Sequence, residues 1–268
     1  MQIILSALKT SVALIFLLYA SFSDYKTREV SNKVWILFAP LALALTIVEL
    51  VLYEDATSML SYGLSFGLVV AFAFILFYSG GFGGADAKAL MCLALALPFH
   101  PEGLTPFSGT ISPISERFFP ITVFSNSVLL AAATAIYMFL RNIIWRVKIG
   151  RKLFEGNQKR ESFGKKALVL ITGYKTSVDK LKEKWHLYPL EDIDDTQNEL
   201  KRKLLLVPKD EGRDAIVERL SKAVETKKIQ NMVWTTPGLP MLIFITSGLI
   251  VALLLGDVVW IFVRFLLE

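Results

Sequence analysis

The chain has 268 residues, 54% of them hydrophobic, and a formal net charge of +5. Soluble proteins are about 45–50% apolar, and the excess here lies in long uncharged blocks, so the sequence predicts a membrane protein. Its one cysteine, Cys92, excludes an intrachain disulfide and a multi-cysteine zinc site. The basic residues are interleaved with acids and show no nucleic-acid-binding motif, so no nucleic-acid partner is expected.

Hydrophobic stretches define the predicted architecture. A bilayer is crossed by about 20 apolar residues, and the first stretch lacks the basic start of a signal peptide. The fourth stretch is short for a full crossing. In the third, Gly63 and Gly67 have a small-xxx-small spacing that favours close helix packing. The predicted spans are residues 3–22, 34–53, 59–78, 87–98, 118–140 and 239–262.

The placement of charge predicts the orientation. Residues 141–231 hold 22 of the 29 Lys and Arg and 14 of the 24 Asp and Glu. Because basic loops stay in the cytoplasm, we expect both termini outside and residues 23–33, 79–88 and 141–231 inside. Asp24 and Asp86 then lie at the cytoplasmic ends of their helices.

The predicted fold class is an all-α polytopic membrane protein, with six transmembrane helices and a small α/β cytoplasmic domain between the fifth and sixth. The expected domains are residues 1–147, with five helices and both acids, 148–231, which are soluble, and 232–268, with the last helix. Within the soluble domain, the runs Ala167–Thr172 and Lys203–Val207 are candidate strands.

Two further features of the soluble domain can be interpreted. Residues 210–227 alternate apolar and charged side chains at helical spacing, which would place Ile216, Leu220 and Val224 on one face. The acidic run at residues 191–195 is interpreted as an exposed, solvated loop in preference to a cation site.

The stretch with most chemical content is residues 80–90, Gly-Gly-Phe-Gly-Gly-Ala-Asp-Ala-Lys-Ala-Leu. Its simplest interpretation is a flexible loop with a surface pair, Asp86 and Lys88. However, two carboxylates at one membrane depth, Asp24 and Asp86, can hold one proton between them if they are close. Such a pair can activate water as a base and protonate a leaving amine as an acid. That chemistry is aspartic peptide hydrolysis, and it needs no metal or cofactor.

Two short motifs resemble a known family. Residues 83–88 resemble the Gly-x-Gly-Asp motif of intramembrane aspartyl proteases, in the form followed by x-Lys. Asp24 is followed eight residues later by Asn32, which resembles the other catalytic segment of type IV prepilin peptidases. These two motifs and the predicted layout of the spans make the chain most similar to the archaeal preflagellin peptidases of that family. It departs from the motifs at Ala85, where the family has a second Gly, and at Ser31, where Pro is common.

The resemblance implies roles for particular residues. Asp24 and Asp86 would be the catalytic pair. The chain lacks the Cys-x-x-Cys domain of many bacterial members, so neither zinc nor methyl transfer is expected. The residues implied to shape the site are Gly83, Gly84, Ala85, Lys88 and Asn32.

The implied activity is removal of short, basic class III signal peptides from preflagellin or prepilin-like precursors at the cytoplasmic border of the cell membrane. Three alternatives remain open. A presenilin-like protease would carry a Pro-Ala-Leu motif, which is absent from the sequence. A small transporter could use the same acids as proton or ion relays. A membrane scaffold could bind anionic lipid through its basic loop.

Overall fold

The structure is a computed structural model that describes residues 1–53, 56–79, 82–150, 152–196, 199–205, 212–237 and 240–267. The chain divides into two units, one formed by Met1–Ala131 with Pro240–Glu268 and the other by Ala132–Leu239. The domain boundaries expected from the sequence stay a prediction.

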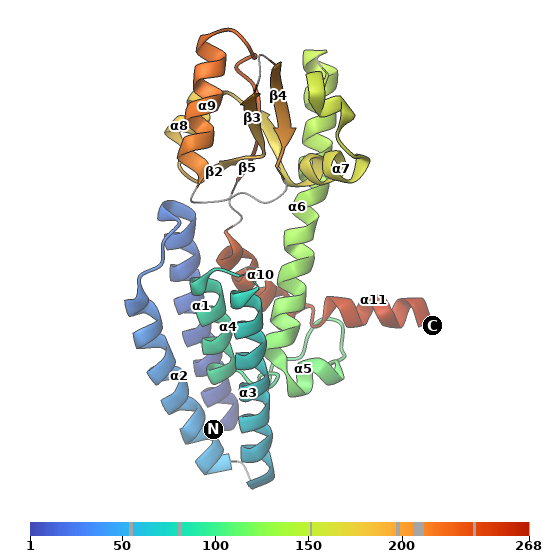
Figure 1. The fold of residues 1–268 in the computed structure, drawn as a ribbon. Helices are drawn as coiled ribbons and strands as arrows, with labels where there is room; N and C mark the ends of the chain where they lie inside the picture. The colour runs from blue at the N-terminus through green and yellow to red at the C-terminus, as the bar shows by residue number, and fades with distance from the viewer. Residues whose placement is uncertain are drawn as a thin grey trace. The chain divides into compact units, whose positions relative to one another are not determined.

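The first unit is helical (Figure 1). Within the described residues, four helices are long and apolar enough to cross a membrane, namely α1, α2, α3 and α6, and the pair α10 and α11 qualifies together although it is bent by 54°. The chain is therefore a mostly helical, multi-pass membrane protein with four or five candidate spans. The helices are α1 (Gln2–Thr27), α2 (Asn32–Tyr53), α3 (Ala56–Tyr78), α4 (Gly84–Ala96), α5 (Pro113–Arg117), α6 (Phe119–Ile149), α10 (Met241–Leu254) and α11 (Val258–Leu267). The residues of α6 from Ala132 onward belong to the second unit.

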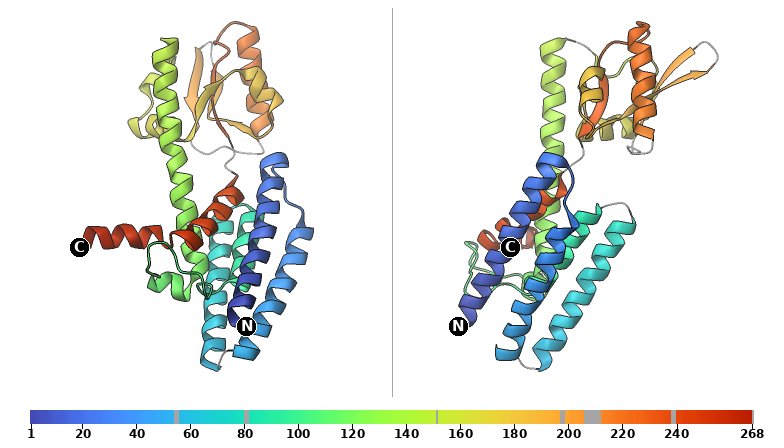
Figure 2. Two further views of the ribbon diagram at one scale, coloured as in Figure 1. Left: turned by 180° about the vertical axis from the view of Figure 1, so that it is seen from behind. Right: turned by 90° about the vertical axis from the view of Figure 1, so that its left-hand side faces the viewer.

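The short helix α4 lies at the centre of this unit and contacts α1, α2, α3 and α10 (Figures 1 and 2). Its 13 residues reach about 20 Å at 1.5 Å per residue, less than the roughly 30 Å of a hydrocarbon core. Seven of them are buried, and four of the seven are alanines, which let neighbouring helices approach closely. The fourth apolar stretch therefore forms a buried core helix that is too short to cross by itself.

Buried hydroxyl groups connect the helices. The Thr46 hydroxyl donates to the Leu95 carbonyl at 2.7 Å, which joins α2 to α4. The Ser21 hydroxyl donates to the Leu242 carbonyl at 2.9 Å, which joins α1 to α10. Such bonds satisfy polar groups that hydrocarbon cannot, and they add to the apolar packing between helices.

The last predicted span is not one continuous helix. It breaks between α10 and α11 at Gly256, whose φ of +87° suits glycine. Asn126 of α6 stabilises the break by bonding to the backbone on both sides of it. Its Nδ2 donates to the Gly256 carbonyl at 2.9 Å, and its Oδ1 accepts from the Val258 amide at 3.1 Å. The buried Asp257 caps α11 by accepting from the Trp260 amide at 3.1 Å. Hydropathy alone could not show this break.

The expected close packing at Gly63 and Gly67 is not found, because a Cβ at either position would meet nothing within 4 Å. The close approach occurs instead at Gly248 of α10. A Cβ there would lie 2.6 Å from the Val123 carbonyl oxygen and would also clash with the Ser127 hydroxyl of α6. The glycine spacing in α3 therefore has no packing role in this unit.

The second unit contains a small α/β region, as expected (Figure 1). A three-stranded antiparallel sheet has the order β1-β5-β2, and β3 and β4 form a separate antiparallel hairpin. The strands are β1 (Tyr174–Thr176), β2 (Leu187–Pro189), β3 (Glu191–Thr196), β4 (Glu199–Leu204) and β5 (Val233–Pro237). The helices are η1 (Gly156–Arg160), α7 (Phe163–Thr172), α8 (Val178–Glu183) and α9 (Arg213–Glu225).

Helices cover these strands on different sides. The helix α9 packs against β2 and β3, and α8 packs against α9 and β2, whereas α7 and η1 pack against β4. The predicted helical face is confirmed, since Ile216 and Leu220 are buried in one apolar cluster and Val224 packs against it. Residues 210 and 211, the predicted start of this helix, lie outside the described residues.

Two strand predictions need correction. Residues 167–172 form the second half of α7 and not a strand, because the Ser162 hydroxyl caps that helix by accepting from the Lys165 amide at 3.3 Å. A short apolar run fits a buried helix as well as a strand, and the cap decides between them. The second predicted strand, residues 203–207, overlaps β4 only at its last two residues, Lys203 and Leu204, and residues 206 and 207 lie outside the described part.

The acidic run is a strand and not an exposed loop. Asp192 and Asp194 in β3 are opposite Lys203 and Lys201 in β4, so the charges alternate in sign across the hairpin. Glu191, the first residue of the run, is fully buried. Complementary charge on the partner strand, and not solvation, explains this run.

Candidate active site

Asp24 lies one turn before the end of α1. The helix ends at Arg28, which adopts the left-handed conformation with φ 58° and donates its amide to the Asp24 carbonyl at 2.9 Å. The Asp24 side chain is partly buried. It interacts electrostatically with the Arg28 guanidinium and accepts a hydrogen bond from the backbone of Leu242.

Asp86 lies in the first turn of α4. Its Oδ2 accepts a hydrogen bond of 3.0 Å from the Gly83 amide, so the carboxylate reaches back and caps its own helix. A Cβ at Gly83 would lie 3.1 Å from that oxygen, which is why a glycine fits here. The local sequence therefore fixes both the start of α4 and the direction of the Asp86 side chain.

The helices bring the two acids together. The helices α1 and α4 are in contact, and the carboxyl groups of Asp24 and Asp86 are close enough to interact electrostatically. The sequence places them 62 residues apart, so only the packing of α4 within the bundle creates this proximity. The arrangement offers two partly buried carboxylates at one end of the helices, which is what acid–base chemistry on one substrate requires.

Lys88 and Asn32 also meet at this end. The Lys88 ammonium donates a hydrogen bond of 2.7 Å to Asn32 Oδ1, joining the second turn of α4 to the start of α2. Both side chains are exposed. The other residues implied to shape the site have weaker structural grounds. Gly84 would tolerate a Cβ, which would make an ordinary 3.6 Å contact with Phe77, and Ala85 packs against the core cluster.

The contribution of α10 could not be anticipated from spacing. Its first turn supplies the Leu242 backbone group that binds Asp24, and the Ser21 hydroxyl contacts the Thr246 hydroxyl at 2.7 Å. The start of a helix presents free amide groups that favour a nearby carboxylate. Pro240, the residue before α10, is the one sequence signal that marks this helix start.

The remaining chemistry-bearing side chains lie elsewhere. Within the described ranges, no three His, Cys, Asp or Glu side chains are grouped as metal ligands. Cys92 is buried in the middle of α4. His100 follows α4 at its other end, and His186 lies in the second unit.

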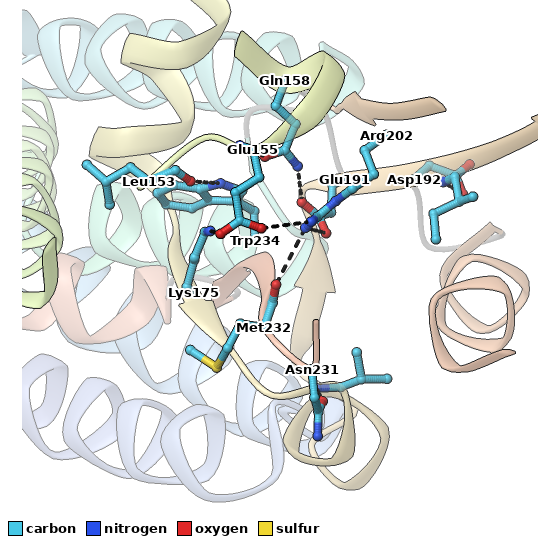
Figure 3. A network of polar contacts seen from close by, with 12 residues as sticks. Leu153, Glu155, Gln158, Lys175, Glu191, Asp192, Arg202, Asn231, Met232 and Trp234 are labelled. Atoms are coloured by element: carbon cyan, nitrogen blue, oxygen red, sulfur yellow. Dashed lines mark hydrogen bonds and ion pairs between the residues drawn. The ribbon is translucent and has the colours of Figure 1, made fainter. Parts of the chain in front are cut away.

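A separate network of polar side chains lies in the second unit (Figure 3). Arg202 donates to Glu191 at 2.6 Å and approaches Glu155 at 3.4 Å, and the Gln158 amide donates to Glu191. Glu155 also pairs with Lys175 at 3.5 Å. Burial raises the pKa of Glu191, an effect that Arg202 opposes, and burial lowers the pKa of Lys175.

This network attaches the segment before α7 to the strands. Glu155 and Gln158 lie on that segment, whereas Glu191 and Arg202 lie on β3 and β4. The Trp234 indole adds a hydrogen bond of 3.2 Å to the Leu153 carbonyl. Its buried members are mutually bonded, so the network is a structural element of the unit.

The helical unit with two carboxylates at one end defines a membrane protein equipped for acid–base chemistry. Comparisons with known proteins agree with this class. Residues 11–140 match the model of the type IV leader peptidase family, and residues 165–258 match that of the archaeal peptidase A24 C-terminus, type II.

Three curated relatives match nearly the whole chain, and each is a preflagellin peptidase. The one from Methanococcus voltae is 29% identical over 92% of this chain and 94% of its own length. The relative from Methanocaldococcus jannaschii is 26% identical over 92% of this chain and 93% of its own length. The relative from Methanococcus maripaludis is 25% identical over 90% of this chain and 92% of its own length. The chain belongs to the type IV leader peptidase family, peptidase A24, as an aspartic-type peptidase of its archaeal preflagellin peptidase group.

Proposed function

We propose that this protein removes short, basic class III signal peptides from preflagellin or prepilin-like precursors, with Asp24 and Asp86 as the catalytic pair. The observation that carries the proposal is the electrostatic interaction between these two carboxyl groups, which lie on the contacting helices α1 and α4. The names of the curated relatives support the substrate class.

The chemistry follows from two adjacent carboxyl groups that hold one proton. The ionised carboxylate takes a proton from water as the water oxygen attacks the scissile carbonyl carbon. The protonated partner stabilises the developing oxyanion by donating its proton. When the tetrahedral intermediate collapses, the first group returns its proton to the leaving amine, the partner takes its proton back from a hydroxyl of the intermediate, and the carbon–nitrogen bond breaks. Neither step needs a side-chain nucleophile.

In the proposed orientation, the two acids lie on the cytoplasmic side of the membrane, where the basic leader of the substrate stays. Residues 141–231 carry 22 basic residues, so the positive-inside rule places them, with Asp24 and Asp86, on the cytoplasmic side. Six crossings are proposed: the four long helices, the bent pair α10 and α11, and α4, which is too short to cross by itself and would cross together with its flanking loops. A precursor whose apolar helix lies in lipid would then present its cleavage point at the same membrane border.

A cleavage assay tests the proposal. Membranes containing the protein are mixed with a precursor that has a basic leader, an apolar helix and a small residue at the junction. We expect Asp24→Asn and Asp86→Asn each to lower the cleavage rate by about 100-fold or more, because an amide can neither take up nor release the proton. Each variant is first checked for equal amount and correct membrane insertion.

Asp214→Asn is the matched control, because this side chain is 95% exposed and lies on α9 in the second unit. Its cleavage rate should equal that of the wild type. If both Asp24→Asn and Asp86→Asn still cleave at the rate of the control, the catalytic pair is wrong. If the wild-type protein cleaves no such precursor, the substrate class is wrong.

A further inference from the structure

The helix α7 in the second unit exposes apolar side chains. Phe163, its first residue, is 86% exposed, and Leu168 is 45% exposed. Residues four apart lie on one face of a helix, which places Phe163 in line with Ala167 and Ile171, both partly exposed. Val169, on the opposite side, is buried in the core of the unit. The outward face of α7 is therefore apolar, and such a face is typical of an interaction surface.

This helix is held at the level where α6 leaves the bilayer. The apolar stretch of α6 ends at Leu140, and Arg141 follows it. Asn142 lies about 3 Å further along the helix axis than Leu140. Its Nδ2 donates to the Leu170 carbonyl at 2.9 Å and to the Gly173 carbonyl at 2.7 Å. The end of α7 therefore lies beside α6 at the membrane border (Figure 1).

Exposed apolar residues continue on α6 beyond this level. Ile144 and Val147 are 54% and 76% exposed, and the exposed Arg146 and Lys148 stand on either side of Val147. Apolar side chains mixed with basic ones are typical of the headgroup region, where basic side chains reach lipid phosphates. The pattern on α6 thus indicates that α7 is at the level of the headgroups.

Positive charge is concentrated next to α7. Residues 141–166 hold 9 basic and 2 acidic residues, whereas residues 167–231 hold 13 basic and 12 acidic ones. The net charge of the second unit therefore comes almost entirely from the end of α6, from η1 and from the first turn of α7. Charge of this sign attracts an anionic surface.

The basic side chains of η1 are close to the start of α7. Lys159 and Arg160, the last two residues of η1, are exposed. The Lys166 ammonium of α7 donates to the Lys159 carbonyl at 3.1 Å, which joins the two helices. The nearest acid, Glu161, is already paired with Lys165 at 3.1 Å. The charge left beside the apolar face is therefore positive.

We propose that α7 is an interfacial helix that docks the second unit on an anionic lipid surface. Its apolar face lies at the boundary between the headgroups and the acyl chains, and the basic side chains beside it contact lipid phosphates. A lipid surface fits this face better than a protein partner does, because α7 is level with the membrane border and the charge around it has one sign. Under the orientation proposed above, the lipid is that of the cytoplasmic leaflet.

The first experiment places a nitroxide spin label at Leu168→Cys in the full chain, with Cys92→Ala removing the native cysteine. The chain is held in nanodiscs that mix phosphatidylcholine with anionic phosphatidylglycerol. Oxygen concentrates in lipid and a charged nickel complex stays in water, so their collision rates with the label report its surroundings. The label at 168 should collide more with oxygen. A matched label at Asp214→Cys, an exposed position of α9, should collide more with nickel.

Two results of this experiment would overturn the proposal. A label at 168 that behaves like the one at 214 would show that this face of α7 is in water. A label at 168 that is shielded from both reagents would show that protein covers the face, either a second copy of the chain or another partner.

The second experiment tests the role of charge. Lys159→Gln combined with Arg160→Gln should lower the ratio of lipid-docked to free label by about 10- to 30-fold, which corresponds to about fivefold for each basic residue near an anionic surface. Lys222→Gln combined with Lys227→Gln removes the same charge from exposed positions at the end of α9 and beyond it, and should leave the ratio unchanged. Equal ratios in nanodiscs with and without phosphatidylglycerol would show that α7 does not select anionic lipid, which would also overturn the proposal.

Discussion

The ammonium group of Lys88 donates a hydrogen bond of 2.7 Å to the side-chain oxygen of Asn32. Lys88 follows Asp86 by two residues on α4, and Asn32 is the first residue of α2, eight residues after Asp24. One hydrogen bond thus joins the two segments that carry the proposed catalytic acids. We infer that Lys88 and Asn32 are positioning residues that hold the two carboxyl groups at their working separation.

Replacing either partner should therefore slow cleavage without abolishing it. We expect Lys88→Met and Asn32→Ala each to lower kcat/KM by about 3- to 10-fold, since an exposed hydrogen bond from a charged group contributes about 1 kcal/mol. The double variant should be no slower than the slower single variant, because the two changes remove one shared interaction.

Lys33→Met serves as the control, because Lys33 is an exposed lysine beside Asn32 and outside this hydrogen bond. Its kcat/KM should match the wild type. A double variant whose loss equals the product of the two single losses would show that the residues act independently, which contradicts a positioning pair.

The sequence was sufficient to identify the candidate site because its signals are local. The glycine before Asp86, the helix start and the eight-residue spacing from Asp24 to Asn32 can all be read along the chain. The hydrogen bond from Lys88 to Asn32 could not, because its partners are 56 residues apart and meet only when α4 packs between α2 and α3.

The wrong predictions in the second unit have the same cause. Charged residues are usually exposed, so the sequence alone predicts a solvated loop for the acidic run in β3. Its first residue, Glu191, is buried because Arg202 approaches it to 2.6 Å from the neighbouring strand, and a pattern within one segment cannot reveal that partner. In α7 the competing signal was available in the sequence, since Ser162 is a typical helix cap.

Gly248 allows α10 to approach α6 closely, so Gly248→Ala should destabilise the first unit. The added methyl group would lie 2.6 Å from the Val123 carbonyl oxygen, and backbone there cannot move freely. Overpacking of this kind costs about 1–3 kcal/mol. The measurement is thermal unfolding of the purified full chain in detergent.

Gly67→Ala provides the comparison for the same substitution in a helix. A Cβ at Gly67 would meet nothing within 4 Å, and alanine favours helix by up to about 1 kcal/mol over glycine. This variant should unfold at or above the wild-type temperature. Equal destabilisation by the two variants would show that the contact at Gly248 is not tight.

Asn126 should be required for the break between α10 and α11. Asn126→Leu keeps the approximate volume but leaves the Gly256 carbonyl and the Val258 amide without their partner. Unpaired buried polar groups cost about 1–3 kcal/mol each, so a loss of about 2–4 kcal/mol is expected in the free energy of unfolding. Chemical denaturation of the chain in mixed micelles would measure it.

Ser125→Ala tests whether the loss of any polar side chain in this turn of α6 has the same effect. The Ser125 hydroxyl only donates to the Thr122 carbonyl of its own helix at 3.0 Å, so its loss should change stability by about 0.5 kcal/mol or less. A similar loss in both variants would mean that the bonds from Asn126 to the break are not special.

Glu191 should make the stability of the second unit depend on pH. Burial raises its pKa, so the folded state binds the proton more tightly than the unfolded state does. Its contribution to stability is then fully present below the ordinary value of about 4.3 and is lost as pH rises through the raised folded value. In Glu191→Gln this titration is absent, whatever constant offset follows from losing the ion pair with Arg202.

Hydrogen exchange of the amides in β5, corrected for the intrinsic pH effect on exchange, measures this dependence in the full chain. From about pH 4 to about pH 8, the opening free energy of the wild type should fall relative to that of Glu191→Gln. The comparison with Glu218→Gln should give the opposite sign. Because Lys222 lowers the pKa of the exposed Glu218, the opening free energy of the wild type should rise relative to that of Glu218→Gln over the acidic part of this range. Parallel pH profiles for wild type and Glu191→Gln would show that Glu191 stays ionised throughout, held by Arg202 and Gln158 despite its burial.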